Sequence, residues 1–216
     1  MLALSWSGGK DSTLALEALT RSGRRPDLLL STIDGEREVM PHHETPVPLL
    51  RRQAESLDLP LVLIEIPSRA ANETYEARMR EAFAGPLAEV TEVAFGDLFL
   101  DDLRSYREAR MAEVGRAAGF PLWGRETAGL ADDFAARFDA TICSIDRDQL
   151  PDHQPAVPLD EAFLRSLPEA ADPCGENGEF HTFVHDGPLF EHPVEFEIGG
   201  TVESDDGRFL HAVMEW

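Results

Sequence analysis

The sequence predicts an α/β fold in which an open parallel five-stranded sheet is followed by a small α+β C-terminal lobe. Short apolar runs alternate with amphipathic stretches over the first two-thirds of the chain, which is typical of parallel strands joined by crossover helices. The chain has 216 residues, 43% of them hydrophobic, which is enough to bury a core. Beyond Asp148 the composition shifts to Pro, Asp and His, so we expect domains at 1–148 and 149–216.

The expected strands of the first domain are short apolar runs that end at turn residues. They lie at 2–6, 28–33, 61–66, 90–95 and 140–145. The helices between them are expected at 12–22, 47–57, 72–83 and 101–118, the third capped by Asn72 and the fourth ending near Gly119. In the second domain a short helix at 160–167 precedes a glycine-rich segment at 172–187 and strands at 194–198 and 209–214.

The segment Ser-Gly-Gly-Lys-Asp-Ser at 7–12 joins the first expected strand to the first expected helix. A turn of this kind leaves backbone N–H groups unpaired at the N-terminus of the helix, where they can surround an anion. Glycines let the backbone approach phosphate oxygens, and Lys10 is the only lysine in the chain. The spacing is shorter than that of a Walker A loop. The segment therefore predicts a phosphate site, and the alternative is a capped glycine-rich turn without a ligand.

This loop, directly after an N-terminal strand, resembles that of the PP-loop ATP pyrophosphatases, which have a Rossmann-like fold. The resemblance implies that the β and γ phosphates of ATP are held while a nucleophile attacks the α phosphate, so that AMP and pyrophosphate leave. The implied ATP-binding residues are Ser7, Gly8, Gly9, Lys10, Asp11 and Ser12. We add Asp97, because it follows the strand at 90–95 on the edge where open α/β sheets bind ligands. A surface cap of the next helix is the alternative for Asp97.

A second motif lies at 174–184, where Cys-Gly-Glu-Asn-Gly-Glu-Phe-His-Thr-Phe-Val precedes Asp-Gly-Pro-Leu-Phe. Its polar groups stand beside Phe180, Phe183 and Phe190, which indicates a ligand-binding loop on an apolar base. The motif is similar to the signature of the diphthine-ammonia ligase family, and with both motifs in the expected order the resemblance covers nearly the whole chain. In that family ATP adenylates the diphthine carboxylate on elongation factor two, and ammonia then forms the amide. The stretches at 93–107 and 120–124 resemble a bacterial branch, for which the substrate stays open.

Carried over by this resemblance, the second motif faces the acyl substrate or ammonia. The implied catalytic residues are Lys10, Asp11, Glu176, Glu179 and His181. The implied substrate-binding residues are Gly175, Glu176, Asn177, Gly178, Glu179, His181 and Thr182. A glutamate can accept a proton from ammonia, and His181 is a candidate acid or base because an unperturbed imidazole titrates near neutral pH. An orienting hydrogen bond is the alternative for His181.

Three further groups of residues can be explained without a catalytic role. Cys174 is expected to be a small buried thiol, since nothing else in the sequence demands covalent catalysis. Arg104 and Arg107 are expected to pair with Glu108 on the surface of their helix, although they could reach a phosphate. A zinc site is not expected at 42–44, His-His-Glu, because adjacent residues rarely converge on one ion. Polar contacts to the substrate are the preferred interpretation there.

The chain is strongly acidic, with 41 acidic and 19 basic residues and a formal charge of −22. This balance argues against nucleic acid as a partner, and no apolar run approaches the length of a membrane span. The short apolar N-terminus and two cysteines predict a soluble cytoplasmic protein. Like charges repel ATP, so we expect Mg²⁺ as a cofactor besides ATP.

The leading hypothesis is an AMP-forming amide ligase whose partners are ATP, a carboxylate-bearing substrate and ammonia, with a homodimer left open. The carboxylate belongs to a small molecule or to a modified protein side chain. Two alternatives remain: a PP-loop enzyme that modifies another small molecule or nucleotide, and a non-catalytic ATP-binding regulatory protein.

Overall fold

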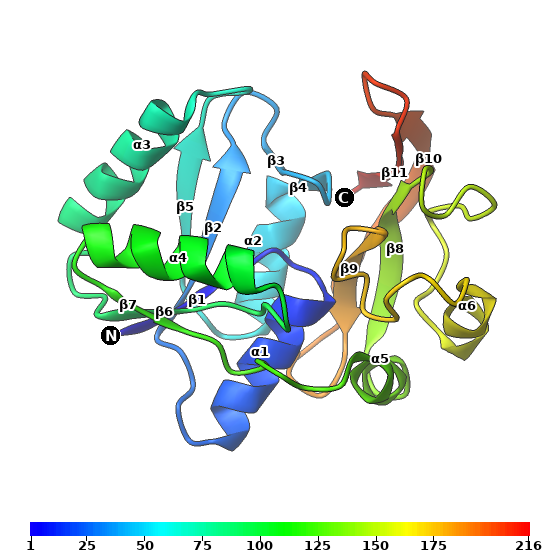
Figure 1. Ribbon diagram of the computed structural model, residues 1–216, viewed down its shortest axis with the longest axis horizontal. Helices are drawn as coiled ribbons and strands as arrows, with labels where there is room; N and C mark the ends of the chain where they lie inside the picture. Colours follow the sequence, from blue (N-terminus) through cyan, green and yellow to red (C-terminus); the bar gives the residue numbers. More distant parts are fainter.

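A mostly parallel sheet of seven strands forms the first part of the computed structural model, which describes residues 1–216 (Figure 1). Its parallel strands lie in the order β5-β2-β1-β6-β7. They are β1 (Leu2–Ser5), β2 (Leu28–Asp34), β5 (Leu61–Ile66), β6 (Glu92–Ala94) and β7 (Ala117–Gly119). The short strands β3 (Val39–Met40) and β4 (Thr45–Pro46) add an antiparallel extension at the end of β2. Strand order reverses between β1 and β6, and open α/β sheets bind ligands at this switch point.

Helices cover both faces of this sheet (Figure 1). The helices α1 (Lys10–Arg21) and α2 (Val47–Ser56) pack on one face, through a core that includes Leu4, Leu14 and Leu50. The helices α3 (Asn72–Ala84) and α4 (Asp101–Glu113) pack on the other, through a core that includes Phe83 and Met111. Successive strand residues such as Ala3 and Leu4 enter opposite cores, as the alternation of side chains along a strand requires.

A second, antiparallel sheet of four strands stands on the α1 and α2 side of the first (Figure 1). Its order is β10-β11-β8-β9, with β8 (Asp139–Asp146), β9 (Phe180–Asp186), β10 (Glu197–Glu203) and β11 (Phe209–Glu215). The helices α5 (Thr127–Ala135) and α6 (Glu161–Ser166) begin at carboxylate caps, Glu126 and Asp160. The larger core contains Leu4 of the first sheet together with Phe134 and Phe180, so both sheets share one apolar interior.

The α/β fold with five parallel strands is confirmed, but the fifth strand is not the one expected. Residues 140–145 were expected in the parallel sheet, whereas β8 pairs only with β9 and β11 of the second sheet. The fifth parallel strand is β7, inside the stretch assigned to a helix at 101–118. That helix ends at Glu113 because Gly115 adopts a positive φ of 71°. The domain division at 148 stays a prediction. The chain passes from the first sheet to the second before that position, because β8 is already a strand of the second sheet.

Smaller differences concern helix starts and missed strands. Asn72 is the first residue of α3 rather than its cap, and the capping position is Ala71, without a side-chain hydrogen bond. The glycine-rich segment at 172–187, expected to be a loop, ends in the strand β9. None of the helices combines the length and the apolar character that crossing a bilayer requires.

Candidate functional site

The loop between β1 and α1 has a shape that only glycine permits at its second position. Gly8 has φ of 79°, and a Cβ atom there would lie 2.6 Å from Oε1 of Gln53. Its carbonyl oxygen accepts hydrogen bonds from Nε2 of Gln53 and from the backbone N–H of Val184, both at 2.9 Å. Gln53 also accepts a hydrogen bond from the indole of Trp6. The loop is thus fixed by α2 and β9 together.

The start of α1 leaves donors free for an anion. The helix begins after Gly9, and no side chain caps it. The backbone N–H groups of Asp11 and Ser12 have no partner in the chain, whereas that of Lys10 donates to Oγ1 of Thr182 at 2.9 Å. Two adjacent N–H groups at the positive end of a helix suit a phosphate. The N-terminus of α1 therefore meets the electrostatic requirement that the sequence predicted.

Lys10 lies inside this site rather than on the surface, with its side chain 1% exposed. Its ammonium group contacts the carboxylate of Asp11. Burial lowers the pKa of Lys10, but the negative charges of Asp11 and Glu176 outweigh burial and leave this pKa raised. Lys10 is consequently a fixed positive charge at neutral pH.

The C-terminal loop before β9 holds two glutamates, one of which faces the cleft while the other is buried within the loop. Glu176 lines the cleft, and its Oε1 accepts a hydrogen bond from the backbone N–H of Leu98 at 2.7 Å. Burial raises the pKa of Glu176 to about 7. Glu179 is 1% exposed and accepts hydrogen bonds from the backbone N–H groups of Asp172 and Asn177 at 2.7 and 3.0 Å. Glu179 therefore braces the loop, while Glu176 is the carboxylate that faces the cleft.

Asp97 enters the cleft from the end of β6, as its place in the sequence predicts. It is 8% exposed and forms an ion pair with Arg107 of α4, Nε to Oδ2, at 2.6 Å. Burial raises the pKa of Asp97. Arg104 pairs with Glu108 as expected, but Arg107 turns inward and its guanidinium lies 4.5 Å from the centre of the Phe95 ring. Arg107 therefore lines the cleft. The prediction that it pairs with Glu108 on the helix surface is wrong.

Histidines from two elements meet beside the phosphate loop. The ring centroids of His43 and His181 are 4.7 Å apart, and those of His42 and His181 are 5.9 Å apart. Burial lowers the pKa of His43 to about 4 and lowers that of His181 well below its usual range. Nδ1 of His43 lies 2.9 Å from the carbonyl oxygen of Thr182, so Nδ1 carries the proton. Both rings are neutral at neutral pH, which leaves His181 unsuited to act as an acid.

These groups surround one cleft of about 230 Å³ between the two sheets. Glycine is required at position 96, because a Cβ atom there would lie 2.8 Å from the backbone of Asp11. The thiol of Cys174 is also in the cleft, but burial raises its pKa to about 12, so it stays protonated. The lining residues are Ser5, Ser7, Lys10, Asp11, Ser12, His43, Phe95, Gly96, Asp97, Arg107, Cys174, Gly175, Glu176, Gly178, Phe180, His181 and Thr182.

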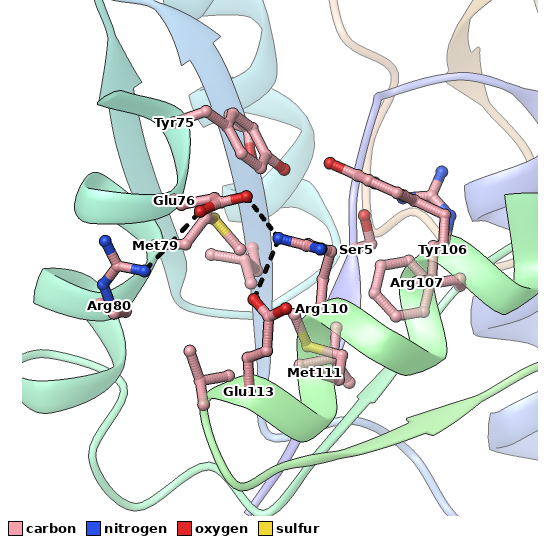
Figure 2. Close-up of a pocket in the computed structure, with 15 residues that line it drawn as sticks. Ser5, Tyr75, Glu76, Met79, Arg80, Tyr106, Arg107, Arg110, Met111 and Glu113 are labelled. Atoms are coloured by element: carbon pink, nitrogen blue, oxygen red, sulfur yellow. Dashed lines mark hydrogen bonds and ion pairs between the residues drawn. The ribbon is translucent and has the colours of Figure 1, made fainter. Parts of the chain in front are cut away.

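A second, more apolar pocket lies between α3 and α4 and adjoins the cleft (Figure 2). Ser5, Phe95 and Arg107 line both. Tyr75 and Met79 of α3 face Tyr106 and Met111 of α4 across it, as Figure 2 shows. An ion pair between Glu76 and Arg110 joins the two helices at its side. The pocket therefore offers aromatic and thioether surface next to the polar cleft.

Comparison with known proteins identifies the family. A model of the diphthamide synthase N-terminal domain matches residues 1–122, and a model of the diphthamide synthase C-terminal domain matches residues 126–206. The chain belongs to the diphthamide synthase family. The resemblance to a PP-loop family that uses ATP is thereby confirmed, while the assignment of residues 7–12 to ATP stays a prediction.

Other comparisons give more distant results. No curated protein sequence matches the chain. One solved structure that matches part of the chain, from Methanocaldococcus jannaschii, is described as a predicted subunit of tRNA methyltransferase. It shares 20% sequence identity and a TM-score of 0.44, over 65% of this chain and 79% of that one.

The cleft unites most of the residues that the sequence predicts for the site of this diphthamide synthase family member. From the phosphate loop, Gly8 and Gly9 shape the backbone rather than line the cleft, and from the second motif Asn177 and Glu179 do not line it either. The predicted catalytic and substrate-binding roles stay predictions for the residues that do. No group of three metal-ligating side chains converges anywhere in the structure. Gln53 was missed as a site-forming residue because its partners, Gly8 and Val184, lie far away in sequence.

Proposed function

We propose that this member of the diphthamide synthase family is an AMP-forming ligase that adenylates a carboxylate and joins it to ammonia. One observation carries the proposal. The phosphate-binding end of α1 and the titratable carboxyl group of Glu176 face the same cleft, although 166 positions separate Lys10 from Glu176. A site that only stored a nucleotide would not need a group with a pKa near neutrality beside the phosphates.

The N-terminus of α1 and Lys10 are the groups that suit the phosphates of ATP. The free N–H groups of Asp11 and Ser12 and the buried ammonium of Lys10 supply positive potential there. The Asp11 carboxylate would also serve Mg²⁺, which proteins usually hold through one or two carboxylates together with substrate phosphates. Mg²⁺ would supply neutralisation of phosphate charge.

The pocket of Figure 2 suits the adenosine part of ATP. It continues from the cleft through Ser5 and Phe95, and its tyrosine and methionine side chains offer the apolar surface that a purine needs. Burial raises the pKa of Tyr75, so its hydroxyl keeps its proton and can donate a hydrogen bond. The polar cleft and the apolar pocket together match a molecule with a charged end and an aromatic end.

Glu176 is the group best placed to handle protons in the proposed reaction. With a pKa of about 7 it is partly ionised at neutral pH and can take a proton from the attacking ammonia. His181 and His43 are neutral, so they are suited to hydrogen bonding of the acyl substrate. Asp97 and Arg107, held together as an ion pair, orient each other at the junction of the cleft and the apolar pocket.

Product analysis tests the proposal. The enzyme, Mg-ATP, ammonium and a panel of small carboxylates should release AMP and pyrophosphate only when a suitable carboxylate is present. Lys10→Ala and Glu176→Gln should each lower the rate at least about a hundredfold, as loss of charge stabilisation or of a general base does. Glu169→Gln, on an exposed residue without an ion pair, is the matched control. Release of ADP and phosphate instead would refute the proposal.

A further inference from the structure

Gln53 of α2 contacts the phosphate loop but does not line the cleft, and its side chain is fully buried. Its Nε2 atom donates to the carbonyl oxygen of Gly8 at 2.9 Å and to that of Val184 at 2.6 Å. Its Oε1 atom accepts a hydrogen bond from the indole Nε1 of Trp6 at 3.1 Å. One amide group thus joins the end of β1, the phosphate loop and β9.

The orientation of this amide is fixed by the chemistry of its partners. An indole N–H can only donate a hydrogen bond, and a carbonyl oxygen can only accept one. Exchanging Nε2 and Oε1 would set Oε1 against two carbonyl oxygens and Nε2 against a donor. Both hydrogens of the NH2 group are therefore committed, one to the phosphate loop and one to β9.

The peptide unit between Gly8 and Gly9 has no side chain on either flank. It can turn as a rigid plane about ψ of Gly8 and φ of Gly9, and glycine tolerates a wide range of both angles. Gly8 already has φ of 79°, and Gly9 has φ of −98°. The two glycines leave the direction of this carbonyl open, so contacts from elsewhere in the chain have to set it.

The direction of this peptide unit decides which of its groups is turned toward the phosphate site. In a trans peptide the C=O and the N–H point in opposite directions. The Gly8 carbonyl points to Gln53 and to the backbone N–H of Val184. On the opposite side the N–H of Gly9 donates to Oγ of Ser7 at 3.2 Å, and Ser7 lines the cleft. The reverse orientation would turn a carbonyl oxygen, which repels an anion, toward Ser7.

We infer that Gln53 is a positioning residue for ATP, which holds the Gly8–Gly9 peptide unit with its donor side toward the phosphates. The inference rests on the part of the proposed function that places these phosphates at the start of α1. Two hydrogen bonds hold the Gly8 carbonyl, and the one from Gln53 comes from a side chain, so a substitution can remove it. The same NH2 group fixes β9, the strand that continues the second motif, against the phosphate loop.

Calorimetric titration of Mg-ATP into the full-length protein measures this effect. Gln53→Met keeps an unbranched side chain of similar length and removes the donor. Loss of a buried hydrogen bond changes an equilibrium on the order of tenfold, so the Kd for Mg-ATP should rise by about that factor.

Gln53→Glu is a second variant, in case methionine impairs folding. It keeps the shape of the side chain and the acceptor for Trp6, and in either protonation state it donates at most one hydrogen bond. Its Kd for Mg-ATP should rise at least about threefold. An unchanged Kd in the variants that fold overturns the inference.

Ser56→Ala is the matched control on the same helix. Ser56 is also fully buried, and its hydroxyl donates to the carbonyl oxygen of His192 and accepts from the N–H of His192. It therefore fastens α2 to the segment after β9 without a hydrogen bond to the phosphate loop. The Kd of Ser56→Ala should stay within about twofold of the unaltered protein. A rise equal to that of Gln53→Met would mean that any loosening of α2 weakens ATP binding, and would overturn the inference.

The amide signal of Gly9 in the NMR spectrum of the ligand-free protein reports the peptide unit directly. Gln53→Met should move this signal upfield, because the N–H loses its hydrogen bond to Ser7 as the peptide turns. Ser56→Ala should leave it in place. A Gly9 signal that is the same in Gln53→Met and in the unaltered protein overturns the inference.

Binding and product formation are separate measurements, so the two proposals fail separately. If Mg-ATP binding depends on Gln53 but no carboxylate yields AMP, the ligase reaction fails and the role of Gln53 stands. If AMP forms and the Gln53 variants bind Mg-ATP as the unaltered protein does, the role of Gln53 fails and the ligase reaction stands. Absence of Mg-ATP binding to the unaltered protein overturns both.

Discussion

Glu176→Gln should make the protein more stable at alkaline pH, which is an unusual result for a site residue. Burial, together with Asp11 and Asp97, raises the pKa of Glu176 from 4.5 to about 7. The folded chain thus favours the protonated acid, and stability that is complete below pH 4.5 is lost as the pH rises through 7. At about 1.36 kcal/mol per pH unit the loss is about 3.4 kcal/mol, and solvent screening of this half-buried side chain reduces it to about 2 kcal/mol.

Glutamine resembles the protonated acid and has no charge to lose, so the variant escapes this penalty. Urea unfolding, followed by tryptophan fluorescence to which the buried Trp6 contributes, gives the free energy of unfolding at about pH 5 and about pH 8.5. The gain of Glu176→Gln over Glu169→Gln, which lowers the overall charge equally, should grow by about 1 to 2 kcal/mol between the two conditions. A gain that is independent of pH would refute the assigned burial and pKa of Glu176.

Four other predictions concern the phosphate loop, His43 and the expected metal. Gly8→Ala should lower the free energy of unfolding by about 2 kcal/mol more than Gly23→Ala in urea unfolding, because both have positive φ but only Gly8 faces a side chain within 4 Å. Thr182→Val should cost about 1–2 kcal/mol in the same measurement, since the backbone N–H of Lys10 loses its acceptor, and Thr182→Ser should cost less. The ring signals of His43 should not titrate by NMR between about pH 8 and pH 5, given its pKa of about 4, and a midpoint near 6.5 would contradict its burial. Removal of Mg²⁺ with EDTA should abolish AMP formation, and activity that persists would exclude the expected metal dependence.

Local sequence predicted the elements whose pattern is complete within a few residues. The strand at 61–66 coincides with β5, and the phosphate loop lies where a strand gives way to a helix. β8 could not be placed in the same way. Its residues 140–146 are all buried, and such an apolar run is equally typical of a parallel strand. Its partners β9 and β11 begin more than thirty residues later, so its sheet depends on tertiary pairing.

The two glutamates of the C-terminal motif illustrate a second limit. Glu176 and Glu179 are three residues apart and chemically identical, so composition assigns them the same role. Their directions are set by the turns that precede each of them, in which Gly175 and Gly178 have φ of 68° and 83°. A glycine marks where such a turn is possible, but which carboxylate it sends inward depends on donors such as the N–H groups of Asp172 and Asn177.

The overall acidity of the chain has a counterpart inside the cleft. Its two cationic side chains, Lys10 and Arg107, are each paired with a carboxylate of the same cleft, Asp11 and Asp97. Little side-chain charge remains to attract a triphosphate, and Glu176 adds negative charge as it ionises. The free N–H groups at the start of α1 then supply the positive potential that remains within the chain. A site built in this way holds phosphates by position more than by net charge, which is why we expect a divalent cation to complete it.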